Sequence, residues 1–196
     1  MDALIVVEDA IIRDEVVNER AAVSGDGAQL VGAACAGDRD AFGRLVRPHL
    51  AQAVGAATLI TANDADGADA VQDALLVAWQ QLAQLRNPEL FPAWFRSIVL
   101  RAALRTTRRA RRIVELHLEV MAPPDQLDRA LDLRTLRRAL VRLDTKDRVL
   151  LTLHHYWELP VAETARLLGV PEGTVKSRVH YALNRLRAAY EAEERR

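Results

Sequence analysis

The sequence predicts an all-α protein of two small helical domains joined by a linker, the second of them containing a helix-turn-helix. Three observations favour this fold class. Half of the 196 residues are hydrophobic, with Ala and Leu prominent among them, and these residues lose little rotamer freedom in a helix. Apolar residues recur every three or four positions through most of the chain. An acidic stretch with two adjacent prolines, residues 113–130, interrupts this periodicity and has the composition of a linker.

The charges are segregated along the chain, although the formal net charge is zero, with 27 basic and 27 acidic residues. Residues 1–28 form an acidic extension, and residues 113–130 hold four acids against one arginine. Residues 94–112 hold seven arginines and no acid, and residues 131–196 hold 13 basic residues against nine acidic ones. Because local basic blocks, and not the net charge, attract phosphate, both blocks favour a nucleic-acid partner.

Several function classes are disfavoured by what the sequence lacks. Cys35 is the only cysteine, which excludes an internal disulfide and a cysteine-rich zinc site, and we expect it to be a buried thiol. There is no Gly-rich phosphate loop and no Gly-x-Ser-x-Gly motif. His154 and His155 are adjacent, so they should point in different directions on a helix and make a poor metal pair. We expect no catalysis, no cofactor and no metal.

The N-terminus lacks a basic leader, and no stretch approaches the roughly 18 apolar residues expected of a membrane span. These features predict a cytoplasmic protein without membrane insertion. The role of the acidic extension and the true start of the protein are left open by the sequence.

The first domain is predicted to span residues 29–112. Two packed helices should run from residue 29 to about 60, broken near Gly37-Asp38, with Val54 on their apolar stripe. A turn at 60–67 should lead into a capped helix over about 68–85, and a further helix should run from 93 to 112.

The second domain is predicted to span residues 131–190, followed by a short tail, 191–196. Asp144 should cap the helix that carries Val149 and Leu153. A helix-turn-helix follows in residues 161–186, in which Gly169 permits a left-handed turn and Pro171 suits a first helical position. The small packing face of its first helix is expected at Ala162, Ala165 and Leu168, and the second helix should bury Val175, Val179, Ala182 and Leu186.

The outer face of that second helix has the chemistry of a major-groove reader. Polar and basic side chains recur there while the apolar ones face inward. The alternative is that this face has no binding role and is only the solvent-exposed side of a helical hairpin. We predict DNA contacts from Thr174, Lys176, Ser177, Arg178, His180 and Tyr181.

The arginine-rich block indicates a second phosphate-binding face. Arg101, Arg105, Arg108 and Arg112 are spaced by four, three and four, so they stack along one side of a helix. A lone charge run is usually a solvated face. These arginines have no acidic partner on their own helix, and an external polyanion relieves their mutual repulsion. The predicted DNA contacts in this block are Arg96, Arg101, Arg105, Arg108, Arg109 and Arg112.

Three segments together resemble sigma factors of the extracytoplasmic-function (ECF) class of the sigma-70 family. Residues 161–178 resemble the domain that reads the promoter −35 element, and residues 91–112 resemble the helix that reads and melts the −10 element. Residues 69–79 resemble the helix that grips the clamp helices of RNA polymerase's largest subunit, which implies that Asp69, Gln72 and Asp73 bind core polymerase. The four aspartates 64, 66, 69 and 73 are an alternative metal site, but a poor one, because no His or Glu completes the ligand set.

The resemblance runs from about Gln29 to Arg187 and implies a sigma factor whose partners are core RNA polymerase and promoter DNA. Many relatives are held inactive by an anti-sigma factor; whether this chain has such a partner, or whether its acidic N-terminus shields the arginines instead, is left open by the sequence. It implies that the loop from Leu85 to Phe91 captures an unstacked −10 base. Arg101 and Arg105 stand where relatives often have Asn and Asp, which puts the identity of the −10 bases in doubt. The alternatives are a stand-alone helix-turn-helix regulator that does not bind polymerase and an adaptor that binds only protein.

Overall fold

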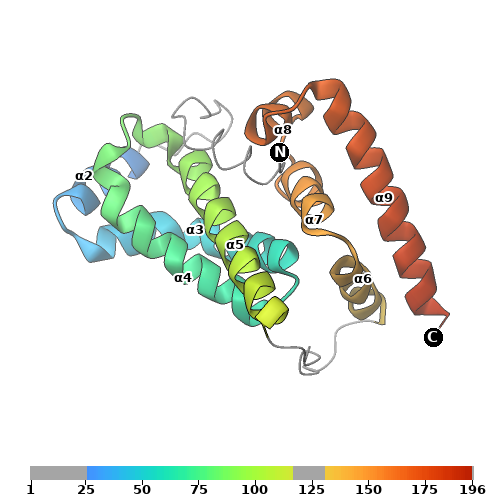
Figure 1. Ribbon diagram of the computed structural model, residues 1–196. Coiled ribbons are helices and arrows are strands. Elements are labelled where there is room, and N and C mark those ends of the chain that lie inside the picture. The colour runs from blue at the N-terminus through green and yellow to red at the C-terminus, as the bar shows by residue number, and fades with distance from the viewer. Residues whose placement is uncertain (1–25, 117–130, 196) are drawn as a thin grey trace.

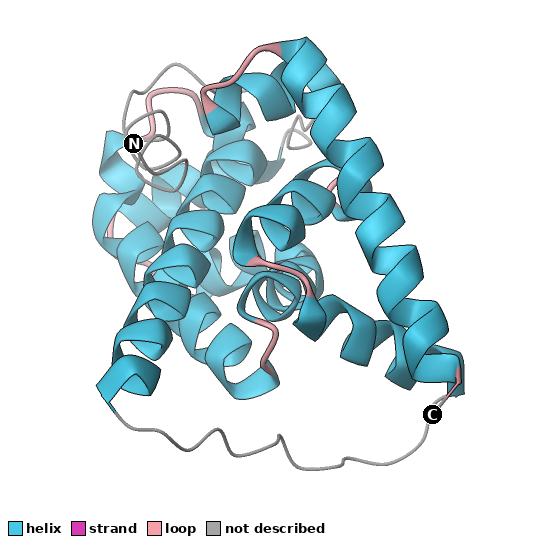
Figure 2. Ribbon diagram, turned by 45° about the vertical axis from the view of Figure 1, so that its right-hand side comes forward, coloured by secondary structure: helices cyan, strands magenta, loops and turns pink. Residues whose placement is uncertain are grey.

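The computed structural model describes residues 26–116 and 131–195, with side chains for residues 27–110 and 135–195. This part of the chain contains helices and turns and no strand, as expected (Figures 1 and 2). Almost all of the acidic extension and the linker lie outside the described residues, as does Arg196. The helices are α2 (Asp26–Cys35), α3 (Arg39–Thr61), α4 (Asp64–Gln81), η1 (Leu82–Gln84), η2 (Pro88–Leu90), α5 (Phe91–Leu116), α6 (Leu131–Arg142), α7 (Thr145–Leu151), a π-helical turn η3 (Thr152–Tyr156), α8 (Val161–Leu168) and α9 (Glu172–Glu194).

Helices α2 to α5 pack together as one group, here called the N-terminal bundle. The predicted break near Gly37 is confirmed, and Asp38 caps α3 by accepting hydrogen bonds from the backbone N–H groups of Asp40 and Ala41. Helix α4 begins at Asp64, four residues earlier than expected, because Asn63 caps it by accepting a hydrogen bond from the N–H of Asp66.

The core of the N-terminal bundle is built around the first turns of α5. Phe91 and Phe95 are buried and stacked, with ring centroids 5.7 Å apart. Two expectations for this bundle are wrong. Val54 is 39 % exposed, and Cys35 is exposed at the end of α2 where it has few helices around it to bury the thiol. Periodicity assigned Val54 to the inside, and the usual burial of free cysteines assigned Cys35 there.

Helices α6 to α9 form the C-terminal bundle, with α9 running along its outer side (Figure 1). The predicted cap of α7 is confirmed, since Asp144 accepts a hydrogen bond from the N–H of Asp147 at 2.8 Å. Gly169 ends α8 with a φ of 62°, as the turn requires. Pro171 precedes the first helical residue of α9 instead of occupying it, with an extended ψ of 148°. Ala162 is exposed, contrary to expectation, and Leu167 is buried in its place.

The two bundles touch where α3 packs against α7 and the π-helical turn, so their buried side chains form one continuous cluster. In both views the C-terminal bundle lies beside α3 and α5 (Figures 1 and 2). Among the described helices, none combines the length and the apolar run that crossing a bilayer requires.

Candidate nucleic-acid interface

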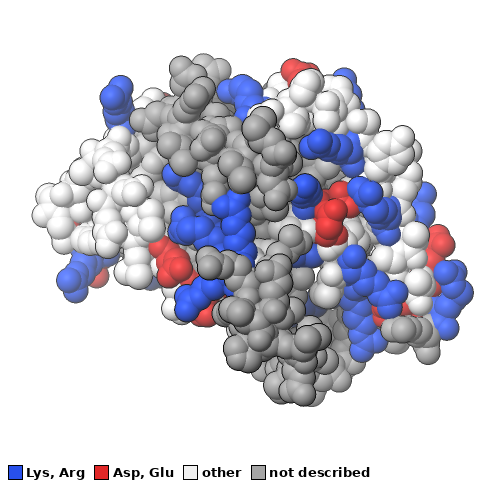
Figure 3. Space-filling view, viewed as in Figure 1, with Lys and Arg blue, Asp and Glu red and all other residues white. Residues whose placement is uncertain are grey.

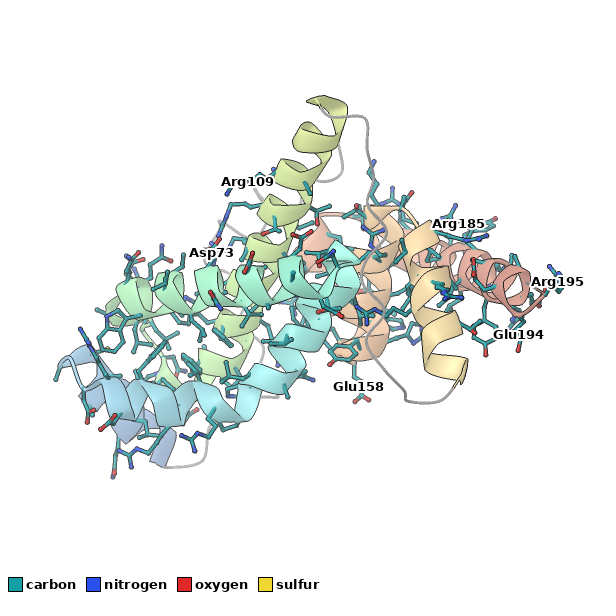
Figure 4. The ribbon with its side chains drawn as sticks, turned by 90° about the horizontal axis from the view of Figure 1, so that it is seen from below. Asp73, Arg109, Glu158, Arg185, Glu194 and Arg195 are labelled. Carbon is teal, nitrogen blue, oxygen red and sulfur yellow. The ribbon has the colours of Figure 1, made fainter. Side chains whose placement is uncertain are left out.

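Helix α5 presents a strip of arginines on one side of the N-terminal bundle. Arg105 and Arg109 are exposed, and Arg101 and Arg108 are partly buried. The guanidinium of Arg101 folds back onto its own helix, where Nε donates to the carbonyl of Ser97 at 3.3 Å. Figure 3 shows basic side chains gathered over α5, and Figure 4 shows Arg109 projecting away from the bundle. The side chain of Arg112 lies outside the described residues.

Arg96 is separated from this strip, although the sequence groups it with the other arginines. It lies one helical turn after Phe91 and Pro92 and is partly buried beside Glu163 of α8. Burial lowers the pKa of Arg96, and the negative charge of Glu163 opposes that shift. Burial also lowers the pKa of His49, and the positive charge of Arg96 acts in the same direction.

The segment just before α5 is a short, capped turn. Asn87 accepts a hydrogen bond from the N–H of Glu89 at 3.1 Å and thereby starts the single turn Pro88–Leu90. The side chains of Arg86 and Asn87 are exposed. The ring of Phe91 packs against Trp94 at 5.8 Å, which anchors the end of the segment in the core.

The outer face of α9 is open to solvent as predicted. The side chains of Lys176, Ser177, Arg178, His180 and Tyr181 are exposed, and Thr174 is partly buried. Burial of Val175, Val179 and Ala182 on the opposite side fixes the direction in which these residues point. Burial of the apolar side of α9 therefore fixes the orientation of its polar side.

A buried carboxylate of α7 fixes the position of α9. Asp147, 5 % exposed at the start of α7, receives both ends of the Arg185 guanidinium: Nε lies 2.6 Å from Oδ2 and Nη2 donates to Oδ1 at 2.8 Å. Such a paired contact fixes both distance and orientation. Figure 4 shows Arg185 in the C-terminal bundle, well away from Asp73 and Arg109.

On α4 the predicted polar positions Asp69, Gln72 and Asp73 are all exposed. Gln72 also borders a shallow groove that sequence reasoning missed. Leu76 stands in this groove with 62 % of its surface exposed, the most of any large apolar side chain in the described part of the chain. The signal was the run Leu75-Leu76-Val77, in which the second residue falls off the helix's apolar stripe. The groove is lined by Arg39, Phe42, Gln72, Leu75, Leu76 and Trp79.

The part of the chain that the structure describes holds no cluster of side chains suited to a metal ion. Across residues 26–116 and 131–195, no three side chains of His, Cys, Asp and Glu come together as a metal site would need. The rings of His154 and His155 lie 4.9 Å apart, which contradicts the expected divergence. The wider π-helical turn on which both stand changes the angle between successive side chains.

Comparison with known proteins gives the same two-part layout. The family model for sigma-70 region 2 matches residues 45–113, and that for sigma-70, region 4 matches residues 133–186. The ECF RNA polymerase sigma factor SigM of Mycobacterium tuberculosis is 38 % identical over 162 residues, covering 81 % of this chain and 82 % of the relative.

Two solved structures resemble the fold. The sigma factor RpoE from Bartonella quintana, in complex with the anti-sigma factor NepR, gives a TM-score of 0.65 at 25 % identity over 76 % of this chain and 96 % of that one. CnrH, in complex with the cytosolic domain of CnrY, gives 0.59 at 28 % identity over 85 % and 97 %.

The match to sigma-70 region 2 disfavours the alternative of a stand-alone regulator, because a regulator that does not bind polymerase would not need a polymerase-binding domain. The predicted family and the two-domain helical fold are therefore confirmed. The chain belongs to the ECF sigma factors, which bind core RNA polymerase and direct transcription initiation at specific promoters.

Proposed function

We propose that three surfaces divide the work of promoter recognition, one on α4, one on α5 and one on α9. The observation that carries the proposal is the α9 face, a row of exposed polar side chains whose direction is set by buried residues on the other side. A helix of this kind fits the major groove of duplex DNA. Residues 29–112 and 131–190 would form the two working domains.

On α4, Asp69, Gln72 and Asp73 would bind core polymerase together with the apolar groove around Leu76. Polar residues at the border of an exposed apolar patch give orientation, and the patch gives affinity. The surface lies on the outside of the N-terminal bundle and is open in the free protein.

On α5, the arginines would hold the backbone of the opened −10 strand. The exposed pair Arg105 and Arg109 supplies phosphate contacts, supported by Arg101, Arg108 and Arg112 on the same helix. The capped turn at Asn87 would receive a splayed base, since single-stranded bases are bound by stacking and by contacts to their edges. Arg96 would join these contacts once its present neighbour Glu163 has moved away.

On α9, Lys176, Arg178 and His180 would face base edges of the −35 duplex while Thr174 and Ser177 approach phosphates. Ser177 Oγ now donates to the carbonyl of Thr174 at 3.1 Å, a local bond that a phosphate can replace. Tyr181, 60 % exposed, would pack on the sugar or on a thymine methyl. We propose further that the protein acts without catalysis, in the cytoplasm, and under an anti-sigma partner such as those bound to RpoE and CnrH.

The test for the −35 surface is promoter mapping with purified core polymerase on fragmented genomic DNA, in which the 5′ ends of transcripts define the promoters used. Lys176→Ala should lower output from −35-dependent promoters by about 5- to 150-fold, since a good base contact contributes about 1–3 kcal/mol of discrimination. Lys146→Ala, an exposed lysine on α7, is the matched control. Core binding should be equal in both variants, and unchanged promoter use by Lys176→Ala would refute the groove assignment.

The test for the α5 surface is open-complex formation, followed by permanganate reactivity of unpaired thymines. Arg105→Glu should reduce that reactivity, and the loss should grow with salt because fewer phosphate contacts remain to resist counterion competition. Arg47→Glu, exposed on α3, is the charge-matched control. An unaltered footprint for Arg105→Glu at all salt concentrations would remove α5 from strand binding.

A further inference from the structure

Two polar side chains, His180 and Asn184, lie on consecutive turns of the exposed side of α9. Both are exposed, and the apolar side of the helix, with Val175, Val179 and Ala182, is buried opposite them. The amide Nδ2 of Asn184 lies 3.0 Å from Nε2 of His180. Side chains four residues apart are neighbours on a helix surface, so the contact is made within α9 and needs no other element.

This contact determines which ring nitrogen of His180 carries the proton. The –NH2 group of the Asn184 amide can only donate a hydrogen bond, so Nε2 of the imidazole accepts it and has no hydrogen of its own. In a neutral ring the single proton is then on Nδ1. His180 therefore presents Nδ1 as an N–H donor and not as an acceptor.

The ring of Tyr181 restrains the imidazole from a second direction. It meets the ring of His180 edge-on, with centroids 5.8 Å apart and an interplanar angle of 69°. Among the side chains that the structure describes, the Asn184 amide is the one hydrogen-bond partner of the imidazole, so Nδ1 is available to a ligand. A ring restrained in this way loses less rotamer freedom when DNA binds.

The acids on the helices that pack against α9 lie in other contacts, so they do not direct the ring proton. Arg185 of α9 is paired with Asp147 of α7, and Arg142 of α6 is paired with Glu193. Glu163 of α8 borders the gap beside α5. On α9 itself, the exposed basic side chains at positions 176 and 178 offer only donors. The amide is therefore the group that sets the protonation of the ring.

A donor on the imidazole selects for acceptors on the major-groove edge of a base. Guanine offers two acceptors there, N7 and O6, and no donor, whereas cytosine offers its N4 amino group as a donor. A ring with the opposite arrangement, protonated on Nε2 and unprotonated on Nδ1, would favour cytosine. The orientation of one amide thus decides between two base preferences.

We propose that Asn184 is a positioning residue that determines which base His180 reads: it keeps the ring proton on Nδ1, and the ring selects guanine in the −35 element. This inference deepens the proposed function and rests on the assignment of the −35 duplex to α9. It involves no change in the fold, since both side chains are exposed.

The test replaces the amide by a carboxylate of the same shape. In Asn184→Asp the side chain can only accept, so a neutral ring must place its proton on Nε2 and present Nδ1 as an acceptor. Each full-length variant, with core polymerase, transcribes a barcoded promoter library whose −35 element is randomised. The position read by His180 is the one at which His180→Ala loses its base preference.

At that position and at pH 8.5, the wild-type chain should prefer guanine to cytosine by about 5- to 150-fold, the range for a good base contact. Asn184→Asp should remove this preference and favour cytosine. Asn184→Ala should weaken it by about twofold if the proton is then shared equally between the two nitrogens. Repulsion between the new carboxylate and phosphate lowers total output but not the ratio of bases within one library.

The pH dependence of that ratio is the second readout. A histidine changes its charge between about pH 5 and 8, and the charged imidazolium donates from both nitrogens. When the pH is lowered from 8.5 to 6, Asn184→Asp should therefore regain the preference for guanine, and the wild-type ratio should stay within about twofold. A residue that only supported the helix would produce no such exchange of bases.

Three outcomes would overturn the inference. The first is a wild-type preference for any base other than guanine at this position. The second is a preference that Asn184→Asp leaves unchanged although His180→Ala loses it. The third is a change at a position that His180→Ala leaves intact, or one that persists in the His180→Ala background, because Asn184 would then contact DNA itself.

Failure of the proposed function is distinguishable from failure of this inference. If neither Lys176→Ala nor His180→Ala alters any −35 preference, α9 does not read the duplex and both fall. If both variants alter base preferences while Asn184→Asp does not, only the positioning role of Asn184 is wrong.

Discussion

Replacing Leu76 by alanine should weaken binding to core polymerase without weakening the fold. Leu76 is 62 % exposed in the free protein, so the side chain contributes little to folding, and a surface change of this kind alters the free energy of unfolding by no more than about 0.5 kcal/mol. Its position beside Gln72 and Trp79 places it at the centre of the proposed docking groove.

The size of the effect follows from the exposed fraction. Full burial of a leucine side chain contributes about 1.5–3 kcal/mol. If polymerase covers the exposed 62 %, the contribution to binding is about 1–2 kcal/mol, which corresponds to about 5- to 30-fold in Kd.

The assay is fluorescence anisotropy of the labelled chain titrated with core polymerase, accompanied by thermal unfolding of each variant. Val54→Ala removes another partly exposed apolar side chain, 39 % exposed on α3 and outside the groove, and should change Kd by less than about twofold. A wild-type Kd for Leu76→Ala, or an equal loss in Val54→Ala, would show that the groove does not contact polymerase.

Three further outcomes concern the fold itself. Asp144→Ala should lower the free energy of unfolding by about 1 kcal/mol through loss of the α7 cap, measured by urea titration, and Asp144→Asn should restore most of it. Phe91→Ala should cost about 3–5 kcal/mol by emptying the core below α5, and a cost under 1 kcal/mol would contradict its central position there. Burial of the imidazole, and secondly the positive charge of Arg96, lower the pKa of His49 below its ordinary value of 6.5. The unfolded chain therefore binds more protons than the folded one near this pH, so the free energy of unfolding should decrease as the pH falls through 6.5. His49→Gln should flatten that slope in urea titrations between pH 7.5 and 5.5, and an identical slope in both proteins would show that another group is responsible.

The local features of the fold were readable from the residues alone. A cap such as Asp144 acts on an N–H three positions away, and the left-handed turn at Gly169 depends on one residue. The buried side of α9 was predictable for the same reason, because Val175, Val179 and Ala182 repeat with the period of a helix.

Errors arose where a position's burial depends on what surrounds the helix. Val54 and Ala162 fall on apolar stripes and are exposed, since no neighbouring helix covers those points. Leu76 breaks the stripe and was missed, although its exposure is what makes it a candidate binding residue. Periodicity identifies a helix face but not the partner that faces it.

The sequence by itself determined the helices, their caps, the family to which the chain belongs and the residue types available for DNA, because each of these depends on residues that are near one another along the chain. Only the tertiary structure decided that Arg148 reaches Ile60 and that Glu163 faces Arg96. Contacts between residues so distant in sequence depend on how whole helices pack, and their surface shapes follow from many side chains at once. Arg96, which composition assigns to DNA, borders the same narrow gap as Glu163 of the C-terminal bundle.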